Sequence, residues 1–207
     1  MTTLVEMASG KGLSLKWLDD VLEIRETANF DLKDIDYDIR IMDSPNEVRD
    51  LIIECNKTRN QSRILAGYCW AWLKEGQNNS DVHDIKIGDF EMSWNLGNTS
   101  TFAIDENSVN EVGCIHTSQG LEFDYAGVII GDDMRYDSTS GRIITDKQAI
   151  SKDDKSSGIR SCKNESIVRK LILNTYKTLL TRGQKGCYVY CEDKSLAEYI
   201  KKKARLA

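Results

Sequence analysis

Two polar segments of the 207-residue chain contain residues that can bind phosphate or stabilise charge. The first lies in Val112–Gly131 (VGCIHTSQGLEFDYAGVIIG), beyond the carboxyl end of a predicted strand, where open α/β sheets bind ligands. Gly120 permits a close approach of the backbone to a phosphate, and Glu122 can accept a hydrogen bond from a ribose hydroxyl. Donors for a nucleic-acid phosphate are His116, Thr117 and Ser118. The alternative interpretation is a polar connection that binds no ligand.

The second segment is Asn174–Tyr190 (NTYKTLLTRGQKGCYVY). Arg182 ends a predicted helix that points at the next strand. From there an arginine can reach an adjacent nucleotide and stabilise charge on a transferred phosphoryl group. The alternative is an arginine that neutralises the negative end of its own helix.

Other side chains that could do chemistry lack partners at the right spacing. No cluster of His, Cys and carboxylates has metal-ligand spacing, so we predict no metal site. None of the six cysteines forms a CxxC pair, and we expect free thiols of a reducing, cytoplasmic protein. His83 is expected on the surface. Trp70 and Trp72 adjoin the apolar run ILAGYCW and are expected in the core, with a stacking face for bases as the alternative.

Composition and charge exclude few functions. The chain has 28 basic and 33 acidic residues, a net charge of -5, so overall charge does not indicate nucleic-acid binding, although a basic groove is compatible with it. Lys201, Lys202, Lys203 and Arg205 are expected to form a solvated helix end, with a phosphate contact as the alternative. No apolar run reaches the roughly 18 residues of a membrane span, and residues 1–16 lack the apolar core of a signal peptide.

The elements that must position these residues alternate between strand and helix. Ser44 and Glu47 form the pattern of a capping box before a helix from Pro45 to about Lys57. The other predicted helices are 15–24, 164–181 (with Gly183 as its C-terminal glycine) and 195–205, and residues 68–74 are predicted to form a helical turn or a short helix. The predicted strands are 37–42, 63–67, 90–95, 101–104, 112–115, 125–131 and 186–191. This alternation predicts an α/β fold with a mainly parallel sheet flanked by helices.

Two stretches fall outside that alternation. Residues 132–162 are polar and mixed in charge, and we expect an insertion or a mobile loop with a hairpin near Arg142–Thr145. Asp19-Asp20 lies in the first amphipathic helix and is expected on its solvated face.

The two polar segments together resemble known helicase motifs. IHTSQGLEFD followed by a buried strand resembles motif V of superfamily-one helicases of the UvrD type, and TYKTLLTRGQKGCYVY resembles motif VI, in the same order. More broadly, the stretch from about Trp17 to Ile200 is similar to the C-terminal half of a helicase-like family related to the Schlafen-group helicases. The phrases WLDDVLEIRETANFDL, LAGYCWAWL, NEVGCIHTSQGLEFDYAGVIIG and NTYKTLLTRGQKGCYVYC carry this similarity.

The resemblance implies the second RecA-like domain of an ATP-dependent DNA or RNA helicase or translocase, a P-loop NTPase fold that closes one side of an ATP cleft. Arg182 would be the arginine finger. The residues implied at the nucleotide are Gln119, Gly120 and Glu122. His116, Thr117 and Ser118 would contact single-stranded nucleic acid. The implied ligands are ATP with magnesium, and the implied partner is an upstream P-loop domain of the same protein.

The departures from the family pattern limit what this chain can do alone. No G-x-x-x-x-G-K-[ST] phosphate loop is present, and Ser9-Gly10-Lys11-Gly12 lacks its spacing. No apolar strand ends in the paired acids of a magnesium site. We therefore expect residues 1–13 to precede a single domain of residues 14–207 that neither holds nucleotide tightly nor hydrolyses it. The alternatives are a non-catalytic module that binds nucleic acid or a partner, and a nucleotide-driven switch that unwinds nothing.

Overall fold

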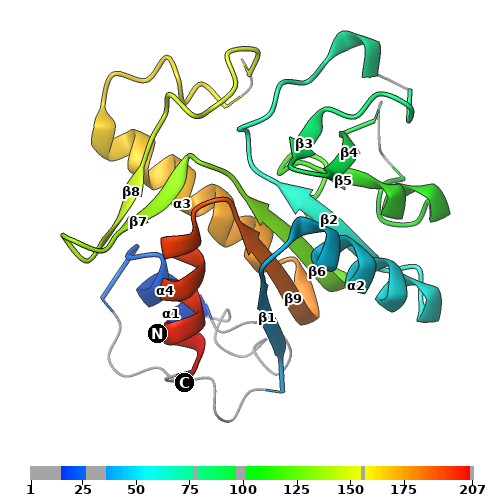
Figure 1. Cartoon of the computed structure of the whole chain (residues 1–207), viewed down its shortest axis with the longest axis horizontal. Helices are drawn as coiled ribbons and strands as arrows, with labels where there is room; N and C mark the ends of the chain where they lie inside the picture. Colours follow the sequence, from blue (N-terminus) through cyan, green and yellow to red (C-terminus); the bar gives the residue numbers. More distant parts are fainter. Residues whose placement is uncertain (1–14, 27–35, 77–78, 97–100, 155–156, 206–207) are drawn as a thin grey trace, which may run out of the picture.

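A seven-stranded sheet of order β1-β9-β6-β2-β5-β4-β3 forms the centre of the computed structural model, which describes residues 15–26, 36–76, 79–96, 101–154 and 157–205 (Figure 1). Every neighbouring pair is parallel except the antiparallel pair β3–β4. The strands are β1 (Asp38–Met42), β2 (Ser62–Ala66), β3 (Ile85–Ile87), β4 (Phe90–Trp94), β5 (Glu111–Gly113), β6 (Phe123–Ile130) and β9 (Gly183–Cys191). With helices on its faces, this sheet confirms the predicted α/β class and is consistent with a RecA-like domain.

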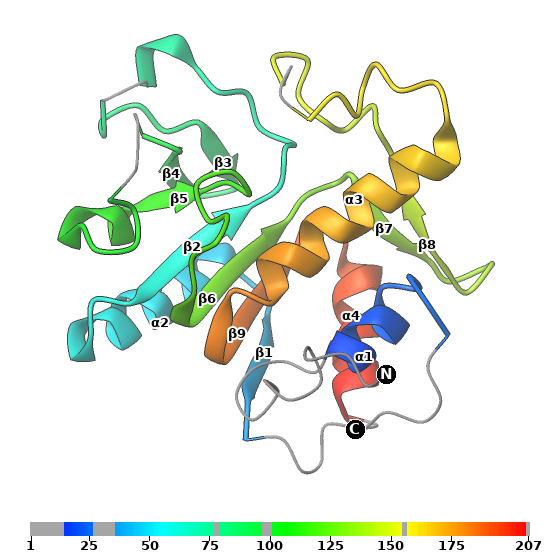
Figure 2. The ribbon, with the colours of Figure 1, turned by 180° about the vertical axis from the view of Figure 1, so that it is seen from behind.

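Helices cover both faces of the sheet. The α-helices are α1 (Leu15–Val21), α2 (Pro45–Thr58), α3 (Glu165–Leu180) and α4 (Lys194–Arg205), and short 3₁₀ helices are η2 (Lys74–Gly76) and η3 (Glu106–Asn110). Helix α2 covers the face seen in Figure 1, and α3 crosses the opposite face seen in Figure 2. Helices α1 and α4 lie side by side beyond β1, where the Tyr199 hydroxyl donates to the Val21 carbonyl at 3.0 Å.

The start of α2 follows from its sequence as predicted. The Ser44 hydroxyl accepts from the Asn46 amide at 3.2 Å, and the Glu47 carboxylate accepts from the Ser44 amide at 3.2 Å. Pro45 occupies the first helical turn, where the missing amide hydrogen costs nothing. The capping box therefore fixes where α2 begins, directly after β1.

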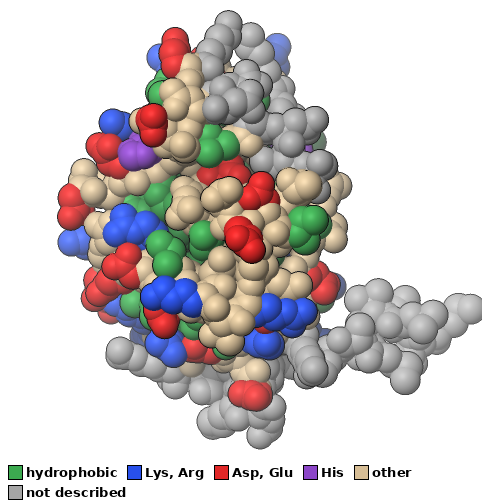
Figure 3. Space-filling view, turned by 90° about the vertical axis from the view of Figure 1, so that its right-hand side faces the viewer, with side chains coloured by type: hydrophobic (Ala, Val, Ile, Leu, Met, Phe, Trp, Pro, Cys, Tyr) green, Lys and Arg blue, Asp and Glu red, His purple; other side chains and the backbone are tan. Residues whose placement is uncertain are grey.

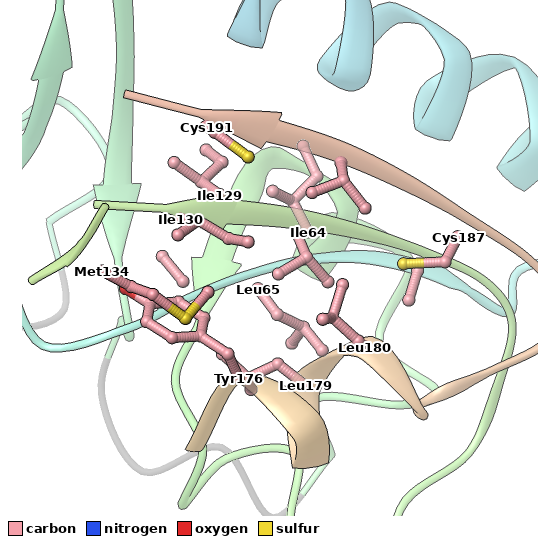
Figure 4. Close-up of a cluster of buried hydrophobic side chains, with 14 of the residues drawn as sticks. Ile64, Leu65, Ile129, Ile130, Met134, Tyr176, Leu179, Leu180, Cys187 and Cys191 are labelled. Carbon is pink, nitrogen blue, oxygen red and sulfur yellow. The ribbon is translucent and has the colours of Figure 1, made fainter. Parts of the chain in front are cut away.

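The core lies between the sheet and its helices. Figure 4 shows Tyr176, Leu179 and Leu180 of α3 pointing at the central strands, where Leu65 and Ile130 are fully buried. Strand β2 is buried along its whole length, and β6 is buried from Ala126 onward. The apolar run Ala126–Ile130 of β6 is typical of parallel strands that are covered on both faces, whereas β2 also buries Ser62 and Arg63.

The segment after β6 is packed against the domain. Strands β7 (Met134–Asp137) and β8 (Arg142–Thr145) form the predicted antiparallel hairpin, which contacts α4 through β7 and α3 through β8. Apolar side chains in this segment are buried at Met134, Ile143, Ile150 and Ile159. The described part of the segment thus packs against two helices and contains the predicted hairpin.

Several local predictions are also wrong. Residues 101–104 form a turn rather than a strand, and β3 was missed. Residues 67–73 are irregular, and only η2 follows them. Gly183 does not end α3 as a left-handed residue but begins β9, where an added Cβ would lie 2.1 Å from the Gly186 carbonyl oxygen.

Asp19 is not on a solvated face. Its side chain is fully buried and accepts from Lys177 of α3 and from Arg25, so it ties α1 to α3. Asp20 is partly exposed and pairs with Lys203 of α4 at 2.9 Å. The prediction failed because the periodicity of α1 alone does not reveal a cation supplied from 158 residues away.

Candidate functional site

The connection between β5 and β6, residues 114–122, runs from the carboxyl ends of the strands to their amino ends. We call these two sides of the sheet the carboxyl edge and the amino edge. Both strands run parallel to β2, so the chain must return from the carboxyl edge to the amino edge. It does so through turns in which Ser118 N donates to Cys114 O at 3.0 Å and Leu121 N donates to Ser118 O at 3.1 Å. The predicted site residues are consequently divided between opposite edges of the sheet.

At the amino edge, Arg182 meets the end of this connection. Its Nη1 donates to the Leu121 carbonyl at 3.0 Å, its Nε donates to the Thr178 carbonyl at 3.1 Å, and its own carbonyl accepts from Phe123 N at 2.9 Å. The bond to Thr178 is the helix-end contact that we gave as the alternative, and the bond to Leu121 brings the two motif segments together. The helix-end contact is therefore present, and contact of Arg182 with a nucleotide stays a prediction.

The residues predicted at the nucleotide are exposed beside Arg182. Gln119, Gly120 and Glu122 are all on the surface. Gly120 has a φ of 76°, and an added Cβ would meet nothing within 4 Å. The backbone there is open to a ligand, in a conformation that favours glycine. From the sequence, these three residues were predicted at the carboxyl ends of the strands, where open α/β sheets bind ligands. In the structure they lie at the amino edge, directly before β6.

Cations surround the same edge. Asp124, at the start of β6 and only 14% exposed, pairs with Lys185 at 2.9 Å and with Arg59 at 3.6 Å. Both cations are more than half exposed. Together with Arg182 they give this edge three positive side chains, which suits an anionic ligand. The sequence did not single out Arg59 and Lys185, because they come from the end of α2 and from β9.

At the carboxyl edge lie His116 and Thr117. His116 is exposed, and its Nε2 is 3.1 Å from the Tyr68 hydroxyl. The Thr117 hydroxyl donates to Asn95 Oδ1, and it accepts from Cys114 N at 3.3 Å. Ser118 is fully buried and its hydroxyl donates to the Ile115 carbonyl at 3.3 Å, so it is not accessible as a phosphate donor.

A cavity of about 310 Å³ opens beside His116. Its lining residues are Tyr68, Trp70, Trp72, Trp94, Asn95, Cys114, His116, Asp153 and Asp154. Trp72 is 43% exposed and Trp70 is half-buried, so the expectation that both pack in the core is wrong for Trp72. Two features of the sequence pointed to this cavity: the aromatic-rich phrase GYCWAW, for which a stacking face for bases was the alternative, and His116.

A buried polar network lies behind the cavity, at the end of β6. Gly131 N donates to the Tyr176 hydroxyl at 3.1 Å, and that hydroxyl donates to the Asp133 carboxylate. Burial raises the pKa of Asp133 to about 6, against the hydrogen bond from Tyr176. A Cβ on Gly131 would meet Cys69 at 2.5 Å and Trp70 at 3.2 Å. The network therefore supports the wall of the cavity.

A larger cavity of about 540 Å³ lies away from both motifs, between α1, α4 and the β7–β8 hairpin. Its charged lining is mostly paired internally: Glu23 binds Arg142 at 3.1 Å, and Asp20 binds Lys203. Tyr136 and Tyr199 stack there, with ring centroids 4.3 Å apart. We interpret it as a hydrated seam between elements.

Within the described ranges, no three His, Cys, Asp or Glu side chains are grouped so as to hold a metal ion. None of the helices in these ranges is long and apolar enough to cross a membrane. All six cysteines are free, at positions 55, 69, 114, 162, 187 and 191.

Comparison with known proteins now gives the family. The model of the Schlafen group 3 DNA/RNA helicase domain matches residues 8–193. The chain belongs to this family. An uncharacterized protein of Saccharomyces cerevisiae, YPL245W, is 28% identical over 172 residues, which are 79% of this chain and 36% of the yeast protein. The chain thus spans about a third of that relative's length. The predicted relation to the Schlafen helicases is confirmed, and the assignment to a UvrD-type second domain stays a prediction.

Proposed function

We propose that this chain is the second RecA-like domain of an ATP-dependent nucleic-acid motor and completes an ATP cleft together with a P-loop domain of the same protein. The observation that carries the proposal is the contact between Arg182 and Leu121. It joins the two motif segments at one edge of the sheet, beside the exposed Gly120 and Glu122. Family membership supports a helicase-related role.

The residues at this edge fit a bound nucleoside triphosphate. The open backbone at Gly120 can approach a phosphate, Glu122 can accept from a ribose hydroxyl, and Gln119 stands beside them. Magnesium-bound ATP would be the substrate, and its phosphate loop and metal ligands would come from the other domain. Arg182 would stabilise the negative charge that develops on the transferred phosphoryl group.

Nucleic acid would bind at the opposite edge, near His116 and Thr117. A single-stranded DNA or RNA segment is the ligand that we propose for this surface. The connection 114–122 reaches both edges, which supports coupling between hydrolysis and movement of the strand. We place the protein in the cytoplasm, where its six free cysteines would stay reduced.

The test is ATP hydrolysis by the full-length protein, with and without single-stranded DNA and RNA, beside the 207-residue chain. We expect turnover only in the full-length protein, with stimulation by one nucleic acid. Arg182→Ala should lower kcat by about a thousand-fold, the scale for removal of an arginine finger. ATP affinity should change much less, because the finger acts on charge that develops in the transition state.

A matched control removes an arginine elsewhere. Arg135 is half exposed on β7 and pairs with Asp146, away from the motif segments. Arg135→Ala should leave turnover unchanged. Normal turnover in Arg182→Ala would refute the role of this residue. If the full-length protein hydrolyses no ATP under any condition yet binds nucleic acid, the non-catalytic module replaces the motor. Hydrolysis without translocation or unwinding would instead favour a nucleotide-driven switch.

A further inference from the structure

The cavity at the carboxyl edge has the composition of a site for a flat heterocyclic group. Tyr68, Trp70 and Trp72 supply aromatic surfaces. All three residues follow β2, and this strand, buried along its whole length, anchors the segment that carries them. A volume of about 310 Å³ is at the lower end of the range of ~300–1,000 Å³ for small-molecule sites, so it suits one base better than a larger ligand.

Asn95 contributes a hydrogen-bond donor to the lining. Trp94 is 5% exposed, and its indole Nε1 is buried without an acceptor in the part of the chain that the structure describes, so this N–H does not open into the cavity. Buried indole N–H groups usually find one. Asn95 uses its Oδ1 for Thr117, and no acceptor for its Nδ2 is found among the described residues. Asn95 also has a φ of 54°, held by a 2.7 Å bond from its amide to the Val112 carbonyl, so its side chain projects from a fixed turn. The amide of Asn95 matches an acceptor on the edge of a base.

The charges near the cavity disfavour a phosphate. Asp153 and Asp154 contribute carboxylates to the lining, and none of the described Lys or Arg residues is part of it. Figure 3 shows that basic and acidic side chains are interspersed over the neighbouring face, on the side of α2 and β3. A phosphate would be repelled at the cavity, whereas the amino group of a base can donate to a carboxylate. The cavity therefore suits the base of a nucleotide whose phosphates lie outside it.

We infer that this cavity is a stacking pocket for one base of a single-stranded nucleic acid. The base would lie against Trp72, with Asn95 donating to its edge, and the strand would continue past the exposed His116. This inference rests on the proposed function, because the ligand is the strand that we place at the same edge. It adds a base-binding element that is independent of phosphate contacts.

The experiment measures binding of the 207-residue chain to labelled single-stranded DNA and RNA by fluorescence anisotropy. Each oligonucleotide is paired with an abasic version that has the same phosphates and no bases. Trp72→Ala should weaken binding of the base-bearing strand by about 5- to 100-fold, the effect of removing one stacking aromatic. Binding of the abasic strand should not change. The salt dependence should also stay the same, because its slope counts phosphate contacts.

Two further variants separate stacking from damage to the fold. Leu73→Ala removes an apolar side chain that is 41% exposed and adjacent in sequence but not part of the cavity, so it should bind like the wild type. Trp72→Phe keeps an aromatic face and should restore most of the affinity. The DNA and RNA arms show which strand the pocket prefers.

The outcomes are decisive in both directions. The pocket would be overturned if the wild type and Trp72→Ala bound base-bearing DNA and RNA with equal affinity. It would also be overturned if Trp72→Ala weakened binding of abasic strands as much as binding of base-bearing strands. Binding of adenosine monophosphate that depends on Trp72, without binding of any strand, would also overturn it in favour of a free-nucleotide site. The Arg182-dependent ATPase of the full-length protein is measured separately. If the ATPase is absent but strand binding depends on Trp72, the motor is refuted and the base pocket is not. If the ATPase depends on Arg182 but strand binding does not depend on Trp72, only the pocket is refuted.

Discussion

Replacing Asp133 by asparagine should stabilise the protein relative to the wild type at neutral pH. This gain in the free energy of unfolding should disappear in acid. Asp133 is 2% exposed and accepts from the Tyr176 hydroxyl. Burial raises its pKa from 3.8 to about 6, because an ionised carboxylate loses its hydration there. The fold therefore favours the protonated carboxyl group, and ionising it at neutral pH costs stability.

The size of the effect follows from the pKa difference. A folded-state pKa above the unfolded value contributes stability that is complete below about pH 4 and is lost as the pH rises through about 6. At about 1.4 kcal/mol for each pKa unit, the loss by pH 7.5 is about 3 kcal/mol. Asparagine cannot ionise in this range, but its carbonyl oxygen can still accept from Tyr176. The stability of Asp133→Asn minus that of the wild type should thus rise by about 2.4 kcal/mol between pH 4 and pH 7.5, because a small part of the loss has already occurred at pH 4.

The assay is urea unfolding of both proteins at half-unit pH steps over this range, followed by circular dichroism. Taking the difference between two proteins cancels the titration of the other carboxylates. Asp132→Asn is the matched control, because it removes one negative charge at the neighbouring exposed position. A difference that stays flat from pH 4 to pH 7.5 would show that Asp133 is solvated. The structural account of the end of β6 would then be wrong.

Two other substitutions test the packing. Asp19→Asn should lower the free energy of unfolding by about 2 kcal/mol, measured by urea unfolding at neutral pH. This is less than the roughly 3–5 kcal/mol for a fully buried pair, because Lys177 and Arg25 are partly exposed and can be hydrated. Unchanged stability would place Asp19 in solvent. Gly127→Ala should cost about 1–3 kcal/mol in thermal unfolding, because its Cβ would lie 2.7 Å from Val48 and 2.9 Å from Ile52 of α2. Adding Val48→Ala should recover part of that loss, and strict additivity of the two costs would contradict the clash.

The sequence predicted most elements because their signals are local. The capping box at Ser44 and Glu47 fixed the start of α2, and the apolar period of residues 164–181 predicted α3. The hairpin near Arg142–Thr145 was predicted even within a polar stretch. Strand β3 was missed since three residues carry too short a pattern, and it pairs only with β4.

The candidate site was predicted only in part, because its layout depends on strand order. Arg182 and the segment containing Gly120 were identified from their motifs, and the structure brings them together at the amino edge. That His116 would lie at the other edge could not be known before β5 and β6 were placed parallel, on opposite sides of β2. At the cavity, a stacking face for bases at Trp70 and Trp72 was only the alternative, because both residues follow an apolar run, where core packing is the usual outcome.

In the motor that we propose, the buried position of Ser118 would give the connection between the two edges a mechanical role. Its hydroxyl bonds to the Ile115 carbonyl, and its amide and carbonyl bond to Cys114 and Leu121, so residues 114–121 form one hydrogen-bonded unit. One end of this unit is held by Arg182 through the Leu121 carbonyl, and His116 near the other end contacts Tyr68 of the aromatic cavity. In the proposed motor, Arg182 would change partners as ATP is bound and hydrolysed. A shift at Leu121 would then move His116 and the cavity wall without a separate relay, which is the physical continuity that coupling between two sites requires.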